Sequence, residues 1–152
     1  MGIEALALQP GSKATPCNNI YPYLLRKLAI VRANQVWTPD TTYIPVARGF
    51  IYLTAVVDVA SRRVLTHNVA ITLEACHAVE LIEEAFARFG LPEIVNTDQG
   101  SQFTAGDFTD VVLNKGRKLS MDRQGHTKRN AHMEWAFATS LEGMDVGCAG
   151  KI

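Results

Sequence analysis

Three acidic residues stand where a folded chain can bring chemistry together. Asp40 lies inside an apolar and aromatic run, Asp98 follows a short apolar run and precedes a turn containing Gly100, and Glu134 lies four residues after Asn130. A carboxylate among apolar side chains is costly to bury unless a cation compensates its charge. Carboxylates from separate elements supply the hard oxygen ligands that Mg²⁺ prefers. Each acid taken singly is better explained as an exposed or capping carboxylate, so the hypothesis of a metal site rests on all three together.

Three strands are expected to position the first acid. Residues 36–46, 50–59 and 63–71 are rich in β-branched and aromatic side chains, which is typical of strands. The connections between them, residues 47–49 and 60–62, are so short that consecutive strands must pair antiparallel. Asp40 therefore falls within the first strand of a predicted meander.

A helix is expected after this meander. Apolar residues recur at three- and four-residue spacing from Leu73 to Phe89, which indicates an amphipathic helix. Thr72 is the predicted N-cap. Gly90 and Pro92 follow the pattern and indicate where the helix ends.

The remaining elements carry the other two acids. A fourth strand is predicted over residues 93–97, ending at Asp98, and a fifth over 117–121. Between them Thr104 is expected to cap a helix over 105–114, and a last helix, holding Glu134, is expected over 129–142. The order β-β-β-α-β-α-β-α predicts an α/β fold: a five-stranded mixed sheet with helices on both faces.

Composition bounds the class of protein. The 152 residues are enough for one domain, which we expect to comprise an N-terminal linker or arm (1–34), a core (35–142) and an irregular tail (143–152). Apolar residues make up 47% of the chain and charged residues 20%, which excludes a wholly disordered protein. No apolar run is long enough to cross a membrane. The three cysteines are scattered, which favours a reducing cytoplasm. No glycine-rich phosphate loop appears, so no small-molecule cofactor is expected.

The net charge is zero, but its distribution is uneven. Residues 1–36 and 115–152 each carry an excess of three positive charges, and residues 37–114 carry an excess of six negative charges. An acidic centre between basic ends suits a metal site flanked by contacts to nucleic-acid phosphates, although the charges alone are better explained by chance differences between solvated faces. The candidate nucleic-acid-binding residues are Lys115, Arg117, Lys118, Arg123, Lys128 and Arg129.

Four motifs carry a resemblance to a known family. They are Trp37-x-x-Asp40-x-Thr42-Tyr43-Ile44, Asp58-x-x-Ser61-Arg62, Asn96-Thr97-Asp98-Gln99-Gly100-Ser101-Gln102-Phe103 and Asn130-x-x-x-Glu134. Together they resemble the retroviral-integrase-type catalytic core of bacterial insertion-sequence transposases. Thirty-five residues lie between Asp98 and Glu134, which is similar to the spacing in that family's Asp-Asp-Glu triad.

The resemblance implies a fold, an activity and a site. It implies an RNase H-like fold that cleaves and joins DNA strands at the ends of a mobile element and at its target. It also implies that Asp40, Asp98 and Glu134 are catalytic and bind two Mg²⁺ or Mn²⁺ ions when DNA is bound. DNA would then be the main partner, with a homo-oligomer as a further expectation.

One departure keeps alternatives open. Lys128 and Arg129 stand before Asn130, where the family usually has an aromatic residue and an acid. The pattern is compatible with a catalytically silent, truncated or degenerate transposase copy that binds DNA or its parent transposase. An RNase H-like nuclease is a further alternative, because a fold alone does not determine the substrate.

Overall fold

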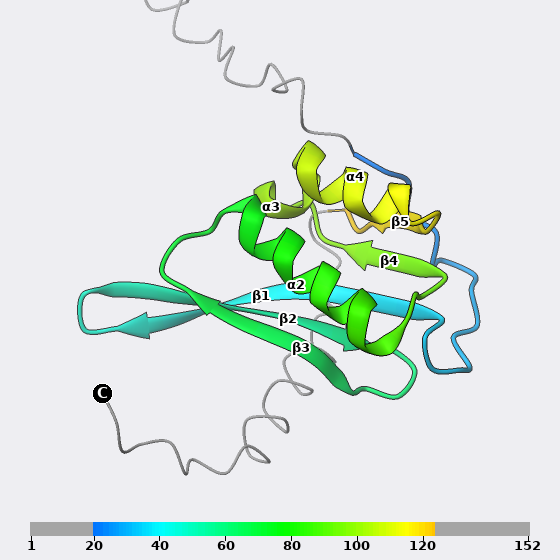
Figure 1. Ribbon diagram of the computed structural model, residues 1–152, viewed down its shortest axis with the longest axis horizontal. Helices are drawn as coiled ribbons and strands as arrows, with labels where there is room; N and C mark the ends of the chain where they lie inside the picture. The colour runs from blue at the N-terminus through cyan, green and yellow to red at the C-terminus, as the bar shows by residue number, and fades with distance from the viewer. Residues whose placement is uncertain (1–19, 124–152) are drawn as a thin grey trace, which may run out of the picture.

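The computed structural model describes residues 20–123, which form a five-stranded mixed sheet in the order β3-β2-β1-β4-β5 (Figure 1). The strands are β1 (Val36–Val46), β2 (Gly49–Asp58), β3 (Val64–Ala70), β4 (Ile94–Thr97) and β5 (Lys118–Met121). The first three form the predicted antiparallel meander, while β4 pairs in parallel with β1 and β5 in parallel with β4. The predicted mixed sheet is confirmed, and β1 is its central strand.

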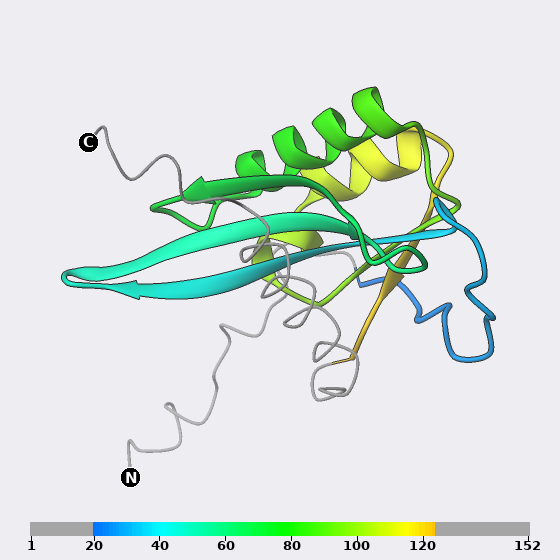
Figure 2. The same cartoon turned by 90° about the horizontal axis from the view of Figure 1, so that it is seen from below.

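The described helices cover one face of this sheet (Figure 2). They are α2 (Ala75–Phe89), α3 (Ser101–Thr104) and α4 (Gly106–Asn114). The helix expected over residues 129–142 lies outside the described residues. None of the helices among residues 20–123 is long and apolar enough to cross a bilayer.

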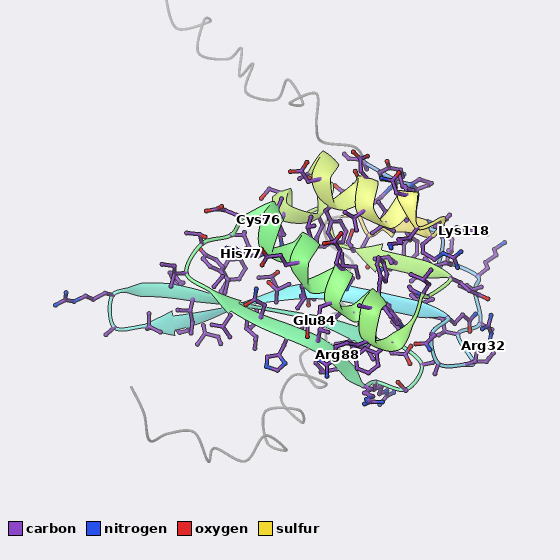
Figure 3. All side chains as sticks on the ribbon, viewed as in Figure 1. Arg32, Cys76, His77, Glu84, Arg88 and Lys118 are labelled. Atoms are coloured by element: carbon purple, nitrogen blue, oxygen red, sulfur yellow. The ribbon has the colours of Figure 1, made fainter. Side chains whose placement is uncertain are left out.

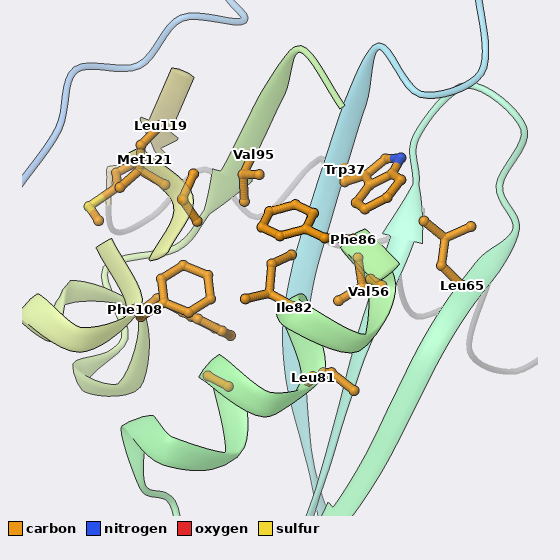
Figure 4. Packing of buried hydrophobic residues seen from close by; sticks show 14 residues of the cluster. Trp37, Val56, Leu65, Leu81, Ile82, Phe86, Val95, Phe108, Leu119 and Met121 are labelled. Carbon is orange, nitrogen blue, oxygen red and sulfur yellow. The ribbon is translucent and has the colours of Figure 1, made fainter. Parts of the chain in front are cut away.

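The main core lies between the sheet and these helices (Figure 4). Trp37 on β1 is fully buried and stacks on Phe86 of α2, with ring centroids 5.9 Å apart. Phe103 and Phe108 are also fully buried and meet edge to face. Truncating a buried aromatic side chain of this size costs about 3–5 kcal/mol, so these four rings hold the layers together.

The predicted start of α2 is wrong. The chain bends at residues 71 and 72 as it leaves the sheet, so the helix begins only at Ala75, with Glu74 as the extended N-cap residue. The Thr72 hydroxyl lies 3.4 Å from His77 Nε2. Leaving the edge strand requires extended residues, and this requirement overrides the local capping preference of Thr72.

The helix predicted over residues 105–114 is also different. Residues 101–114 form two helices, α3 and α4, separated by Ala105 in an extended conformation. Thr104 ends α3, and its hydroxyl donates to Gly100 O at 3.2 Å instead of capping α4. In one continuous helix, residues five apart point about 140° away from each other. The break allows both Phe103 and Phe108 to be buried in the same core.

Residues 20–34 precede the sheet without regular secondary structure. Leu25 is only 2% exposed and packs in a second cluster with Val36 and Ile94. The Leu24 N–H donates to Ser120 Oγ at 3.0 Å. The segment is therefore held against β1, β4 and β5 by an apolar and a polar contact, while the domain boundary at residue 34 stays a prediction.

Candidate active site at the carboxyl ends of the strands

Asp40 lies on the central strand and is half-buried. Its partner on β2 is Ala55, which belongs to an apolar cluster with Leu53 and Val57. The neighbouring position Thr41 faces the other way, because its hydroxyl contacts Gln102 of α3. Since successive side chains alternate across a strand, the Asp40 side chain lies on the face opposite the described helices.

Asp98 directly follows β4, beside the same stretch of β1. The two observed β1–β4 pairs, Val36 with Ile94 and Trp37 with Val95, are each 58 residues apart in sequence. Asp40 and Asp98 are also 58 apart, so each lies three residues beyond the last observed pair. The parallel pairing thus brings together the two segments of the chain that carry these distant acids.

The turn after Asp98 is built around Gly100. The Gly100 N–H donates to Asp98 Oδ1 at 2.9 Å, which orients the carboxylate. A Cβ added at Gly100 would lie 2.8 Å from Gln102 Oε1 and 2.9 Å from Asp98 Oδ1. Real Cβ atoms are not seen so close to other heavy atoms. The glycine therefore lets the acid and the amide approach the turn backbone.

A chain of hydrogen bonds connects this turn to β1. Gln102, which is 5% exposed, donates through Nε2 to Thr41 Oγ1 at 3.3 Å, and this hydroxyl lies 2.9 Å from Thr54 Oγ1. The Thr41 N–H in turn lies 2.8 Å from Asp40 Oδ1. These contacts tie the helix that follows the Asp98 turn to the part of β1 that carries Asp40.

A groove of about 590 Å³ adjoins the Asp98 turn. Gln99 and Arg123 line it on the side of the strand ends, and Tyr21, Tyr23 and Arg26 line it on the side of the segment that precedes the sheet. Guanidinium groups bind phosphates and aromatic rings stack on bases, so this lining suits a nucleic-acid strand. Among these residues, Arg26 was not in the predicted nucleic-acid-binding set.

Three other predicted basic residues lie elsewhere. Lys115, Arg117 and Lys118 stand before or at the first residue of β5, whereas Asp98 follows the last residue of the neighbouring parallel strand. Arg117 donates to the carbonyl oxygens of Lys115 and Pro92. Figure 3 shows Lys118 at the same end of the sheet as Arg32. The structure does not bring these three residues together with the acids.

Three predicted site residues, Lys128, Arg129 and Glu134, lie outside the described residues. Their roles stay predictions. In residues 20–123, no group of three or more His, Cys, Asp and Glu side chains is close enough to hold a metal ion. The two described acids supply hard carboxylate oxygens, which fit Mg²⁺ or Mn²⁺, but a site made of the predicted triad needs the third acid.

Asp58 of the second motif has a structural role instead. It is 2% exposed, and its carboxylate accepts hydrogen bonds from Ser61 Oγ at 2.6 Å and from Asn34 N at 3.3 Å. Arg62 adopts a positive φ of 60° in the turn that follows, where its N–H donates to Asp58 O. The motif therefore closes the β2–β3 turn against the start of β1, where Asp58 pairs with Trp37.

One acid at the strand ends was missed by sequence reasoning. Asp122 directly follows β5, as Asp98 directly follows β4, and its N–H donates to Thr97 O at 2.8 Å. The same signal, an acid immediately after a short apolar strand, was available in the sequence.

Comparison with known proteins decides the family. Residues 31–127, more than half of the chain, match the family described as "Integrase core domain". The chain belongs to the integrase core domain family. The resemblance inferred from the four motifs is confirmed, as is the fold that it implied.

Curated relatives of this integrase core are insertion-sequence transposases. The transposase for insertion sequence element IS904 of Lactococcus lactis is 33% identical over 112 residues, covering 70% of this chain and 43% of the relative. Transposase InsF for insertion sequence IS3A of Escherichia coli is 31% identical over 106 residues, covering 68% of this chain and 37% of the relative. The chain spans less than half the length of these two relatives.

Solved structures show the same fold at lower sequence identity. The HTLV-2 integrase catalytic core domain in complex with magnesium, in a dimeric form, has a TM-score of 0.53 at 19% identity and covers 74% of this chain and 76% of its own. The catalytic core domain of BIV integrase has a TM-score of 0.58 at 16% identity, covering 72% of each chain. These likenesses establish the RNase H-like architecture of the sheet and helices described above.

Proposed function

We propose that this integrase core cleaves and joins DNA strands during transposition, by phosphoryl transfer with two divalent metal ions. The observation that supports the proposal is the shared 58-residue offset: Asp98 directly follows β4, and Asp40, inside the neighbouring strand β1, stands equally far beyond the observed β1–β4 pairs. Ligands of α/β sheets bind at the carboxyl ends of the strands. Kinship with insertion-sequence transposases supports DNA as the substrate.

The proposed roles follow from the chemistry of the side chains. Asp40, Asp98 and Glu134 would hold two Mg²⁺ or Mn²⁺ ions, with Asp40 shared between them. Such a pair of ions, when bound, makes the attacking oxygen more nucleophilic and stabilises the charge on the leaving oxygen. The Gly100 N–H and the Gln102–Thr41 contact would keep the two described carboxylates in position before DNA arrives.

The groove beside the Asp98 turn supports a path for one DNA strand. Arg26 and Arg123 would neutralise phosphates, and Tyr21 and Tyr23 offer rings on which bases can stack. Lys115, Arg117 and Lys118 would contact DNA further from the reacting phosphate. Binding through phosphates is independent of sequence and weakens steeply as salt rises.

A strand-cleavage assay tests the proposal. The full chain is incubated with Mg²⁺ or Mn²⁺ and a labelled duplex that carries the terminal repeats of the element that encodes it, and cleaved and joined strands are separated on a denaturing gel. We expect activity that is lost in Asp40→Asn and in Asp98→Asn but kept in Asp110→Asn, which alters an exposed acid on α4. Equal cleavage by all four proteins would overturn the assignment of the acids.

The same assay separates the second candidate function. The basic Lys128-Arg129 pair before Asn130 favours a silent copy that binds DNA or its parent transposase without chemistry. DNA binding without cleavage by the wild-type chain would support that reading. Cleavage of an RNA–DNA hybrid but not of duplex DNA would instead indicate an RNase H-like nuclease.

Self-association and location complete the proposal. The related HTLV-2 core is described in dimeric and trimeric forms, and we propose that this chain also forms a homo-oligomer on DNA. Its relatives are transposases of bacterial insertion sequences, which supports a place of action in the bacterial cytoplasm.

A further inference from the structure

Basic side chains gather around the loop that connects α2 to β4. The guanidinium carbons of Arg63 and Arg88 lie 5.2 and 5.4 Å from the ring centre of Phe89, the last residue of α2. In the same loop, Arg117 Nη1 donates to Pro92 O at 3.3 Å. Basic residues from the β2–β3 turn, from α2 and from the residue before β5 are therefore brought to one loop.

Two further basic residues lie at the end of this loop. The Lys118 N–H donates to Glu93 O at 3.2 Å, and Arg32 forms an ion pair with the Glu93 side chain. Figure 3 shows Arg32 and Lys118 at the end of the sheet where β1 and β4 begin. We call this group the amino-end basic surface, and it comprises Arg32, Arg63, Arg88, Arg117 and Lys118.

Acids of the chain neutralise this surface only in part. Glu93 pairs with Arg32, and Glu84 pairs with Arg88. The other three basic residues of the surface form no ion pair with an acid among residues 20–123. Two guanidinium groups over one ring are like charges held near each other, and an anion bound beside them would relieve their repulsion. The arrangement therefore favours an anionic ligand.

The width of the surface favours a polymer over a small anion. Arg63 lies in the β2–β3 turn and Lys118 begins β5, so the surface crosses three to four strand spacings of the sheet. At about 4.8 Å for each spacing, this is roughly 14–19 Å. Phosphates along one DNA strand follow each other at about 3.4 Å, so the surface spans about five of them. Guanidinium groups match phosphates in geometry, which makes the backbone of duplex DNA the ligand that fits best.

We propose that the amino-end basic surface binds a second DNA duplex, separate from the strand that reacts at Asp98. The inference rests on the proposed function in taking DNA as the substrate. Asp98 and Arg123 come after the last residues of β4 and β5, whereas the surface is built from residues before or at the start of these strands. DNA in the groove thus leaves the surface open to another duplex. One chain then holds two duplex segments, as a reaction that joins DNA requires.

Two substitutions remove charge from the surface with little structural change. Arg63→Gln and Lys118→Gln alter exposed residues, and neither breaks an ion pair among residues 20–123. Arg48→Gln is the matched control, because Arg48 is an exposed basic residue in the β1–β2 connection, at the other end of β1. A groove variant, Arg26→Gln/Arg123→Gln, gives the comparison with the proposed path of the reacting strand. Melting temperatures of all variants are measured first, so that a misfolded variant is recognised.

Titration of the full chain with a short labelled duplex tests the surface. Divalent metal is left out, so that no strand is cleaved, and sedimentation velocity gives the number of duplexes bound to each chain. We expect two duplexes for the wild type and for Arg48→Gln. The double variant Arg63→Gln/Lys118→Gln should retain one duplex at roughly 200 mM salt, because each lost phosphate contact lowers the slope of log affinity against log salt by about 0.9. The groove variant should also retain one.

The outcomes separate this inference from the proposed function. One duplex for each wild-type chain, or an unchanged number and salt slope in Arg63→Gln/Lys118→Gln, would overturn the second surface and leave the groove and its acids untouched. Displacement of the second duplex by polyglutamate as effectively as by unlabelled DNA of equal charge would assign the surface to an acidic protein segment instead. Two bound duplexes without any strand cleavage in Mg²⁺ would support the second surface while contradicting the proposed catalytic function.

Discussion

Acidic residues at two places on the same sheet, the β2–β3 turn and the carboxyl ends of β4 and β5, differ in burial and in hydrogen bonding. At the β2–β3 turn, Asp58 is 2% exposed and its two oxygens receive hydrogen bonds from Ser61 and from the backbone of Asn34. At the carboxyl ends of β4 and β5, Asp98 is exposed, Asp122 is half-buried, and the nearby oxygen of Asn96 is buried without a partner among the described residues. Both oxygens of Asp58 are hydrogen-bonded inside the fold, which this acid stabilises, whereas Asp98 and Asp122 each accept one hydrogen bond among the described residues.

The largest effect that tests this contrast is on stability. Asp58→Ala leaves the Ser61 hydroxyl and the Asn34 N–H without their acceptor at a buried position. Hydrogen bonds to a charged group contribute about 1.5–3 kcal/mol each, so we expect a loss of about 3 kcal/mol. For a chain of this size the melting temperature falls by roughly 6–12 °C, measured by circular dichroism. Asp98→Ala, at an exposed position, should change stability by less than about 0.5 kcal/mol. Equal losses of stability in the two variants would show that the buried and the exposed acid do not differ in their contribution to the fold.

The second effect concerns metal-dependent stability. Carboxylates brought together without a cation repel each other, and a divalent ion bound only by the folded state relieves this repulsion. At metal about tenfold above its dissociation constant, linkage gives roughly 1.4 kcal/mol of stabilisation, or about 3–6 °C in melting temperature. We expect Asp98→Asn to melt slightly higher than the wild type without metal and to lose most of the rise with Mg²⁺ or Mn²⁺.

The opposite result has a clear meaning. A melting temperature that metal leaves unchanged in the wild type, combined with destabilisation by Asp98→Asn, would mean that a positive charge of the protein already compensates this acid. That outcome would favour the silent copy over an active enzyme.

The third effect is smaller and concerns the turn glycine. The Cβ of Gly100→Ala would displace the carboxylate of Asp98 and the amide of Gln102, whose ends are flexible, so we expect a stability loss below about 1 kcal/mol. The affinity for Mn²⁺ should nevertheless fall several-fold, because a ligand is moved. Gly106→Ala is the matched control, since nothing lies within 4 Å of a Cβ there and the position begins α4. Equal Mn²⁺ affinity in the two variants would show that the turn does not orient the acid.

The smallest effect distinguishes the two sets of basic residues. Arg26→Ala and Arg123→Ala remove groove residues, and each should lower the slope of log affinity for DNA against log salt by about 1. Lys115→Ala is the comparison at the other end of β5. Fluorescence anisotropy with a labelled duplex between roughly 50 and 200 mM salt measures the slopes. A loss of slope with Lys115→Ala alone would move the DNA path away from the groove.

The strands were predictable because their signal is local. The runs of β-branched and aromatic residues that gave residues 36–46 and 93–97 coincide with β1 and β4 to within one residue. The helix starts were not predictable in this way. Thr72 and Thr104 have side chains typical of N-caps, but Thr72 lies in the bend after β3 and the Thr104 hydroxyl is bonded to Gly100 O. The capping preference of a side chain is overridden wherever the backbone needs another conformation to pass from the sheet to a helix.

The candidate site was predictable only in part. Residue types and family resemblance indicated Asp40 and Asp98, but the parallel pairing of β1 with β4, whose partners are 58 residues apart, is not visible in the sequence. The place of Asp122 directly after a short apolar run is visible there, but its level beside Asp98 depends on the β4–β5 register, which is not. Arg26 was likewise indistinguishable from other basic residues until the groove brought it opposite Arg123.

The bond from Leu24 N to Ser120 Oγ has a consequence for the order of folding. It joins residues 96 positions apart, and the groove beside it draws one wall from each of these two regions. Contacts this distant in sequence form late, since the whole intervening chain must be closed into a loop first. During synthesis, the β1–β2–β3 meander can pair while the ribosome is still adding α2, but the groove has no second wall until β5 has emerged. A nascent chain therefore has its central acid, Asp40, long before it has the surface proposed to receive a DNA strand.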